Sequence, residues 1–211
     1  MASSNTRERI LQTSLALFNA QGLPSVSTHR IAAEMGISTG NLHYHFKAKR
    51  LIVEWLFRRF EERLSTLSEA AGSVRAIDDL WVALHLGFEA VNEYRFVYRD
   101  MAHLESEYPE TAAKSRALMA RNLLNARALC ESLAALGVIR ASADEAEMLA
   151  LQIVFTTTCW LSFERLVAQD AASRRTDTGL AAYYTLTLLA PYVDPPSRAY
   201  LEYLRAKYVQ Q

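Results

Sequence analysis

The chain has 211 residues, of which 51% are hydrophobic and 22% charged, and this composition excludes a disordered tail. The formal net charge is zero, but residues 1–50 hold six basic and two acidic residues, a net charge of +4, whereas residues 51–211 carry a net charge of −4. A basic N-terminal part on a mildly acidic body indicates an end that binds nucleic acid, with chance clustering as the alternative.

Cysteine usage and hydropathy bear on the compartment. Cys130 and Cys159 show no spacing pattern and do not make a disulfide scaffold, so we expect a reducing environment. The first ten residues are polar and charged, unlike a signal peptide. The longest charge-free runs, Met148–Phe163 and Thr178–Val193, have 16 residues each and are too short to span a membrane. We therefore predict a cytoplasmic protein with no membrane partner.

Apolar residues recur at helical spacing nearly throughout, and no alternating strand pattern appears. This pattern predicts an all-α fold of about nine or ten helices. Ser27 and Ser38 are the expected N-caps of the second and third helices, and Gly22 and Gly36 are expected to end the first and second. The first four helices are predicted at residues 7–21, 28–35, 38–46 and from 48 or 49 past 64.

The later segments of the chain are longer. Pro109 suits the first turn of a helix, and Gly137 suits the end of the same helix. The polar stretch 170–177 is predicted to be a loop. Helices are predicted at residues 79–93, 95–106, 109–136, 142–169 and 178–190, with a last helix after Pro195-Pro196 that runs to Val209.

The second and third predicted helices, with the Gly-containing turn between them, make a helix-turn-helix, whose second helix enters the DNA major groove. An outward amide can pair with adenine, an aromatic edge can contact a thymine methyl group, and a Gly permits close approach. If Leu42 and Phe46 point into the core, the outward face is formed by Gly40, Asn41, His43 and Tyr44.

Groups suited to DNA phosphates flank this face. Thr28 and Ser38 lie at predicted helix N-termini, where free backbone N–H groups bind phosphate. Lys47, Lys49 and Arg50 follow the third helix and are expected to contact the phosphate backbone. The stretch ISTGNLHYHFKAKR, which contains no acid, is therefore predicted to face a polyanion.

The stretch IAAEMGISTGNLHYHFKAK resembles the DNA-binding signature of the TetR family of bacterial regulators. The resemblance covers about residues 7–52 and includes the Ile31-Ala32 pair, Gly36 and the His45-Phe46 pair. His43 stands where the family usually has Tyr, a difference that bears on the operator sequence. The resemblance implies that these residues occupy DNA-contact positions: Thr28, His29, Thr39, Gly40, Asn41, His43, Tyr44, His45 and Lys49.

Other interpretations of the same residues stay open. His45 lies close to Leu42 on the helical wheel and could be a packed or capping histidine. Lys47 and Arg50 could form a solvated turn. His43 and His45 do not predict a metal site, because side chains two residues apart on a helix point about 200° apart.

The two charge-free segments at residues 148–163 and 178–193 are apolar on more than one face, whereas a helix buried only in its own core keeps a polar side. We expect the second apolar face to pack against a partner subunit about a two-fold axis, with burial in one chain as the alternative. An arginine at Leu161 or Leu188 is expected to break such a dimer. The TetR resemblance likewise implies dimerisation through C-terminal helices.

The TetR resemblance also implies that the middle helices enclose an effector. Large apolar residues there are individually more typical of a core, but together they predict the lining of a mostly apolar cavity. An Asp100–His103 hydrogen bond is favoured over a metal site, and the stretch RFVYRDMAHLESEYPE also resembles part of the effector domain in some TetR-like regulators. The predicted effector-binding residues are Trp81, His85, Phe88, Asp100, Met101, His103, Phe155, Cys159 and Trp160.

With the resemblance, these features predict an all-α homodimeric transcriptional regulator, with a helix-turn-helix DNA-binding domain at residues 1–50 and an effector-binding and dimerisation domain at residues 51–211. Its expected partners are a palindromic double-stranded DNA operator and a small, mostly apolar effector, and the family's usual action is repression. No cofactor, metal site or enzymatic activity is predicted, because no catalytic set or cofactor motif appears. The alternatives are a DNA binder without an effector, and an all-α enzyme or small-molecule carrier without specific DNA binding.

Overall fold

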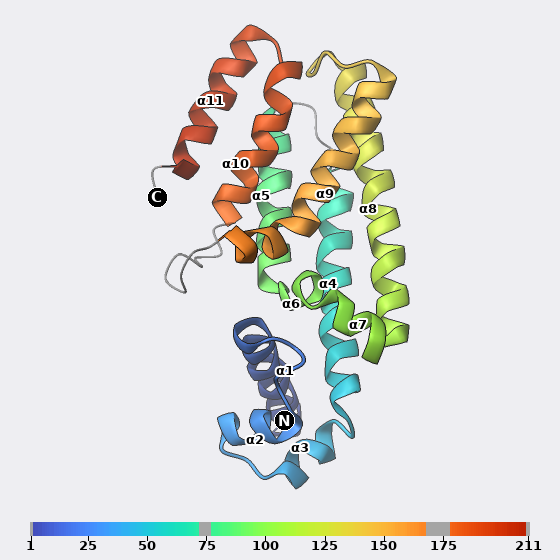
Figure 1. Ribbon diagram of the computed structural model, residues 1–211, viewed down its shortest axis with the longest axis vertical. Coiled ribbons are helices and arrows are strands. Elements are labelled where there is room, and N and C mark those ends of the chain that lie inside the picture. The colour runs from blue at the N-terminus through green and yellow to red at the C-terminus, as the bar shows by residue number, and fades with distance from the viewer. Residues whose placement is uncertain (1, 72–76, 168–177, 210–211) are drawn as a thin grey trace. The chain divides into compact units, whose positions relative to one another are not determined.

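The computed structural model describes residues 2–71, 77–167 and 178–209, and this part of the chain is helical, with no strand and one isolated β-bridge, between Ile139 and Val193 (Figure 1). The all-α prediction is confirmed. The helices are α1 (Ala2–Gln21), α2 (Thr28–Met35), α3 (Thr39–His45), α4 (Lys49–Ala71), α5 (Ile77–Glu93), α6 (Phe96–Arg99), α7 (Met101–Glu107), α8 (Pro109–Ala135), α9 (Ala143–Val167), α10 (Thr178–Leu189), the 3₁₀ helix η1 (Ala190–Tyr192) and α11 (Pro195–Val209).

Local sequence signals account for the helix boundaries of the N-terminal part. The Ser27 hydroxyl accepts a hydrogen bond from the backbone N–H of Arg30 at 3.1 Å, so it caps α2 as predicted. Gly36 ends α2 with a φ of 64°, a left-handed conformation that favours glycine. The predicted loop at residues 170–177 lies outside the described residues, as does the predicted end of the preceding helix at Gln169.

The helix predicted at residues 95–106 is two helices, α6 and α7, and this break adds one helix to the predicted number. Asp100 stands at the break, with φ −106° and ψ 27°. The side chain of Asp100 accepts a hydrogen bond from the backbone N–H of Leu23, 77 residues earlier in the chain. Because this partner is distant in sequence, helical periodicity does not reveal the interruption.

By packing, the chain forms two units, residues 1–62 with 94–116, and residues 63–93 with 117–211. The first unit joins α1, α2 and α3 to α6 and α7. Helices α4 and α8 each contribute residues to both units. The division into functional domains at residue 50 stays a prediction.

The first unit has a core of aromatic side chains. Phe60 of α4 is fully buried, and its ring centroid lies 5.4 Å from that of Tyr94 and 5.7 Å from that of Tyr98. Phe18 of α1 lies 5.5 Å from Phe96 of α6, and both are buried. Residues 94–98 thus contribute aromatic side chains to the core that α1 and α4 share.

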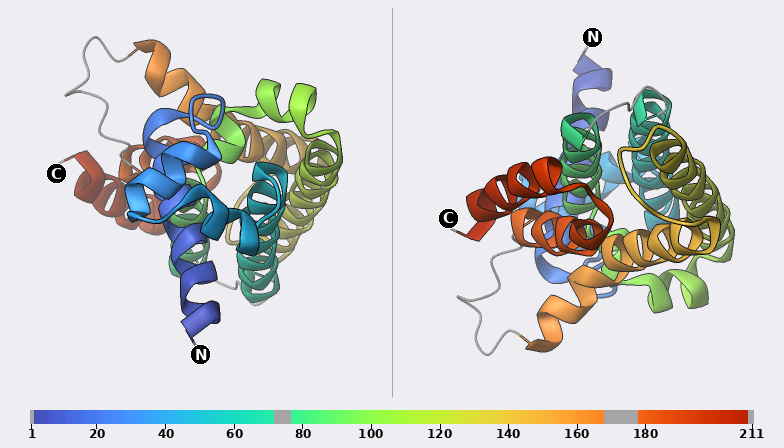
Figure 2. Two further views of the ribbon diagram at one scale, coloured as in Figure 1. Left: turned by 90° about the horizontal axis from the view of Figure 1, so that it is seen from below. Right: turned by 90° about the horizontal axis from the view of Figure 1, so that it is seen from above.

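The second unit is centred on α10, which packs against α5, α9 and α11 and lies between α9 and α11 (Figure 2). Its core contains Leu133 of α8, Leu149 of α9 and Leu186 of α10, all fully or nearly fully buried. Leu161 of α9 is 6% exposed, so it belongs to the chain's own interior. Leu161 is therefore unsuited to report on a subunit interface.

Candidate nucleic-acid interface

Helix α3 is a short helix, and buried side chains on one of its sides fix it to the first unit. The Ser38 hydroxyl caps its N-terminus by accepting a hydrogen bond from the backbone N–H of Asn41 at 3.1 Å. Leu42 and Phe46 are at most 1% exposed, so one side of the helix is anchored in the first unit. The backbone N–H of Phe46 bonds the carbonyl oxygen of Leu42 at 2.9 Å and closes the last turn. The opposite side is consequently fixed in orientation while it faces solvent.

The outer side of α3 carries small, polar and aromatic groups. Tyr44 is 73% exposed, and its ring stands edge-on to that of His45 at 5.2 Å. The helical wheel predicted this exposure, while contact with DNA stays a prediction. The other exposed residues of this face are Thr39, Gly40, Asn41 and His43.

The remaining predicted contact residues differ in accessibility. His29 and Ser38 are exposed, whereas Thr28 and His45 are half-buried. The Nδ1 atom of His43 lies 3.3 Å from the carbonyl oxygen of Lys47. A hydrogen bond there requires a proton on Nδ1, which leaves Nε2 as the ring nitrogen available to another partner.

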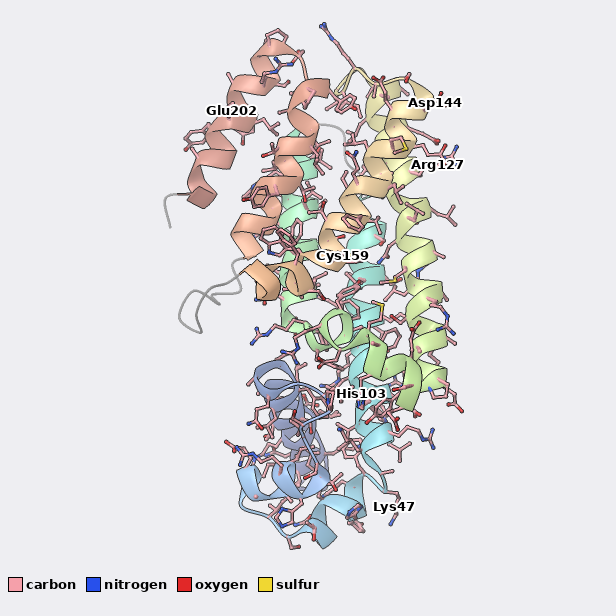
Figure 3. The ribbon with its side chains drawn as sticks, viewed as in Figure 1. Lys47, His103, Arg127, Asp144, Cys159 and Glu202 are labelled. Carbon is pink, nitrogen blue, oxygen red and sulfur yellow. The ribbon has the colours of Figure 1, made fainter. Side chains whose placement is uncertain are left out.

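The three cations that follow α3 are not equivalent. Lys47 is exposed on the turn between α3 and α4 (Figure 3). Arg50 is paired with Glu54 at 2.6 Å and lies 3.7 Å from Glu110. Lys47 is therefore better suited than Arg50 to approach a phosphate directly.

Lys49 is half-buried, and its ammonium is hydrogen-bonded within the first unit. Its Nζ donates a hydrogen bond to the carbonyl oxygen of Leu23 at 2.6 Å and lies 5.6 Å from the Phe18 ring centroid. Burial lowers the pKa of the Lys49 ammonium below its usual value, and the Asp100 carboxylate opposes that shift. The position matches the family signature, and contact with a DNA phosphate stays a prediction, while in this structure the ammonium is hydrogen-bonded within the chain.

Asp100 likewise departs from its predicted role. Its carboxylate accepts from Leu23 N at 2.7 Å and is paired with Arg99 at 2.9 Å, so the expected hydrogen bond to His103 is replaced by these contacts. His103 instead places its ring 5.7 Å from that of Tyr108. With Met101, these two residues belong to the first unit, separately from the other predicted effector-binding residues.

Four of those other residues form two separate groups on α5 and α9 in the second unit. Trp81 and His85 of α5 stack with ring centroids 5.4 Å apart and an interplanar angle of 10°. Phe88 and Ala182 of α10 form a small buried cluster, against which Leu84 and Trp160 of α9 pack. The structure thus places Trp81, His85, Phe88 and Trp160 on two contacting helices of one unit, and their role in effector binding stays a prediction.

Phe155 and Cys159, the last two predicted effector-binding residues, lie on the exposed side of α9. Phe155 is 65% exposed, and Cys159 is also exposed. Residues 143–163 of α9 are long and apolar enough to cross a membrane by length and composition, but Leu149 and Ala150 on this segment are buried in the second unit. Over the described ranges, no three His, Cys, Asp or Glu side chains are placed to hold one metal ion.

A capped, outward-facing second helix on a buried anchor, joined to a helical body, defines a helix-turn-helix protein. Residues 10–55 match the family of bacterial regulatory proteins called tetR, and residues 59–201 match the TetR family described as bacterial transcriptional repressor. The chain belongs to the TetR family, and the resemblance seen in its sequence is confirmed.

Curated relatives match part of the chain. It is 29% identical over 115 residues to the HTH-type transcriptional repressor KstR2 of Mycolicibacterium smegmatis, covering 51% of this chain and 55% of that protein. It is 28% identical over 100 residues to the tetracycline repressor protein class C of Escherichia coli, covering 47% and 44%. The chain thus spans about half the length of the curated relatives it matches.

Solved structures match nearly the whole chain. A TetR-family transcriptional regulator from Marinobacter aquaeolei has a TM-score of 0.83 and 29% identity, covering 96% of this chain and 98% of that one. KstR2 of Mycobacterium tuberculosis, a ketosteroid transcriptional regulator, has a TM-score of 0.68 and 19% identity, covering 90% and 95%. The second likeness supports the fold alone.

Proposed function

We propose that this protein is a cytoplasmic, ligand-responsive transcriptional repressor that binds a palindromic DNA operator as a homodimer. The observation that carries the proposal is the outer side of α3, where Asn41, His43 and Tyr44 are exposed above the buried anchor residues Leu42 and Phe46. An amide, an imidazole and a phenol offer hydrogen bonds and edge contacts to bases. Membership of a family of transcriptional regulators supports the same function.

The operator test uses the full chain and a randomised duplex library, from which bound sequences are selected and their affinities measured by fluorescence anisotropy. We expect an inverted repeat, because two recognition helices of a dimer enter grooves roughly 34–36 Å apart. Tyr44→Ala should weaken specific binding by about 1–3 kcal/mol and leave the circular dichroism unchanged. Selection of no preferred sequence, or unchanged affinity of Tyr44→Ala, would contradict this assignment of the reading face.

The homodimer proposal is supported by a second apolar face on α9. The first face, which includes Leu149, Ile153 and Leu161, is buried in the chain's own core. The second face follows a spacing of three or four residues, which places its members on one side of the helix. Its exposed members are Met148, Leu151, Phe155, Cys159 and Phe163.

A second copy of the chain is the occupant we propose for this α9 face. Four large apolar side chains there are 47–65% exposed in the single chain. Single exposed apolar residues are common on protein surfaces, whereas a row of them on one helix face indicates an interaction site. Helix-turn-helix proteins also pair to match the spacing of half-sites. The sequence predicted a second apolar face on this segment, and these residues are the ones we assign to it. Leu161, which was predicted at the interface, lies in the interior instead.

The proposed effector is apolar and carries a hydrogen-bond acceptor. The indole Nε1 of Trp81 is buried and, within the described part of the chain, has no hydrogen-bond partner. A buried N–H without a partner costs about 1–3 kcal/mol, so an acceptor on a ligand would relieve that cost. The His85 ring stacks on the Trp81 indole, and the apolar cluster of Phe88 and Trp160 lies on the same two helices, α5 and α9. A ketone or ester on an apolar skeleton fits this chemistry.

A further inference from the structure

The backbone of Leu23 is held by two side chains that come from distant parts of the sequence. Its N–H donates to the Asp100 carboxylate at 2.7 Å, and its carbonyl oxygen accepts from Lys49 Nζ at 2.6 Å. The Leu23 side chain itself is fully buried. We call Lys49, Arg99, Asp100 and the Leu23 backbone the Leu23 node.

Arg99 connects this node to the end of α1. Its guanidinium donates to the carbonyl oxygens of Phe18 at 2.5 Å and Asn19 at 2.7 Å, and to the Asp100 carboxylate at 2.9 and 3.1 Å. The guanidinium thereby lies at the C-terminal end of α1, where a cation interacts favourably with the helix dipole. The side chains of Arg99 and Asp100 are 11% and 9% exposed, so solvent screens this pair little.

The break between α6 and α7 supplies the node with its carboxylate. Asp100 closes α6 through its N–H, which bonds Phe96 O at 2.9 Å, and opens α7 through its carbonyl oxygen, which accepts from Leu104 N at 3.0 Å. The Phe96 N–H donates to the Asn19 side chain at 3.2 Å. The segment that includes α6 therefore docks on α1 through both polar and aromatic contacts.

Leu23 and Lys49 lie on either side of the helix-turn-helix in the chain. Leu23 lies in the connection that leads into α2, and Lys49 is the first residue of α4, directly after α3 and its turn. The Asp100 carboxylate thus accepts a hydrogen bond from the segment that precedes the helix-turn-helix and interacts electrostatically with Lys49, which follows it. Without Asp100, the nearly buried Arg99 and the half-buried Lys49 would lose the counter-charge that both of them face, which is an unfavourable arrangement.

We propose that Arg99 and Asp100 are positioning residues for operator recognition, which orient the helix-turn-helix through Leu23 and Lys49, and that Lys49 serves this node instead of a DNA phosphate. The inference rests on the proposed DNA-binding function. It gives the stretch RFVYRDMAHLESEYPE a role in holding the DNA-binding helices. The partial burial of Lys49 and the lowered pKa of its ammonium agree with a cation committed to the protein interior.

The sign of the Asp100→Asn effect separates positioning from simple electrostatics. Loss of a negative charge alone should strengthen DNA binding, because DNA is a polyanion. Positioning predicts that Asp100→Asn weakens binding to the selected duplex by about two- to thirtyfold. Affinity for an unrelated duplex should not fall, whereas a loss of fold would weaken both. The matched control is Glu110→Gln, which removes an acid that is 77% exposed in the same unit and should not weaken specific binding.

Lys49 is tested by the salt dependence of affinity. Lys49→Met should weaken binding to the selected duplex without changing the slope of log affinity against log salt, whereas Lys47→Ala should reduce that slope by about one unit. The double variant Lys49→Met/Asp100→Asn should be no weaker than the worse single variant, because both changes disrupt one node. A slope reduced by Lys49→Met would show a phosphate contact and overturn the role given to Lys49.

Amide hydrogen exchange measures the protection of the Leu23 N–H in the absence of DNA. Asp100→Asn should speed exchange of the Leu23 N–H while the amides of α10 exchange as in the wild type. Unchanged exchange at Leu23, or specific binding unaffected by Asp100→Asn, would overturn the positioning role even if the wild type binds an operator. Failure of the wild type to select any sequence would instead overturn the proposed function, and the positioning role with it.

Discussion

The guanidinium of Arg59 donates to both carboxylate oxygens of Glu8, at 2.8 Å and 2.5 Å, and so ties α4 to α1 across 51 residues of sequence. Hydrogen bonding to Arg59 lowers the pKa of the Glu8 carboxyl, and the same bond raises the pKa of Arg59. The two side chains are 40% and 33% exposed, so solvent weakens the pair. This contact is bidentate, and helical periodicity in the sequence does not reveal it because the two residues lie on different helices.

Glu8→Gln should lower the free energy of unfolding by up to about 1 kcal/mol at pH 7, the range for exposed ion pairs. The native pKa of Glu8 lies below its unfolded value of about 4.3, so its stabilisation is fully present above that pH. It is lost as the pH falls through the native pKa, and wild type and variant should then converge. Urea unfolding at pH 7 and at acid pH measures the difference. Glu34→Gln, in a more exposed pair with Arg30, is the control and should cost less.

Ser38 separates stability from DNA binding. Ser38→Ala removes the cap on the Asn41 N–H and should cost about 0.5–2 kcal/mol of stability, whereas Ser38→Asp keeps a capping oxygen. The added carboxylate would stand on the exposed DNA-facing end of α3, so Ser38→Asp should weaken binding to every duplex while thermal unfolding stays near that of the wild type. Undiminished DNA binding by Ser38→Asp would place the DNA elsewhere.

Helical spacing and capping residues predicted the fold well because they are local. Ser27, Gly36 and Ser38 each act within four residues of their own position, and the boundaries of α2 and α3 follow from them. The outward exposure of Tyr44 follows equally from burying Leu42. These inferences require the geometry of one helix and its caps.

The role of a charged side chain was not predictable in the same way. Lys49 and Asp100 lie 51 residues apart, and each was assigned to a different partner because sequence spacing shows nothing of their shared contact with Leu23. Leu161 and Phe155 lie on the same apolar segment, yet the first is buried and the second exposed. When both faces of a helix are apolar, composition cannot tell which one the chain's own core covers.

Phe155→Arg should convert the dimer to a monomer without unfolding the chain, because the side chain is 65% exposed in the single protomer and would bring a charge into the α9 interface. Light scattering measures the mass. Leu124→Arg, at a side chain that is 67% exposed on α8, is the control and should leave the dimer intact. Leu161→Arg should instead unfold the protein, since its site is in the core. A dimer that survives Phe155→Arg would contradict the proposed interface.

Thiol labelling gives an independent measure of the same interface. Cys159 lies on the exposed α9 face, so alkylation should be slower in the dimer than in the Phe155→Arg monomer. Cys130 is buried, and burial raises the pKa of its thiol to about 11, so it should react slowly in both forms. Equal labelling of Cys159 in dimer and monomer would show that the partner subunit covers another surface.

Trp81→Phe tests the acceptor on the effector. The substitution removes a buried N–H that has no hydrogen-bond partner among the residues the structure describes, so it should not cost the stability that loss of a hydrogen bond normally costs. The probes are an apolar cyclic ketone and the hydrocarbon with the same carbon skeleton, titrated against tryptophan fluorescence. The wild type should prefer the ketone by about two- to tenfold, the worth of one hydrogen bond, and Trp81→Phe should bind the two equally. Because binding to DNA and to an effector are reciprocally linked, the ketone should also bind less tightly when operator is present. A ketone preference that survives in Trp81→Phe would assign the acceptor contact to another group, and no preference in the wild type would rule out this class of effector.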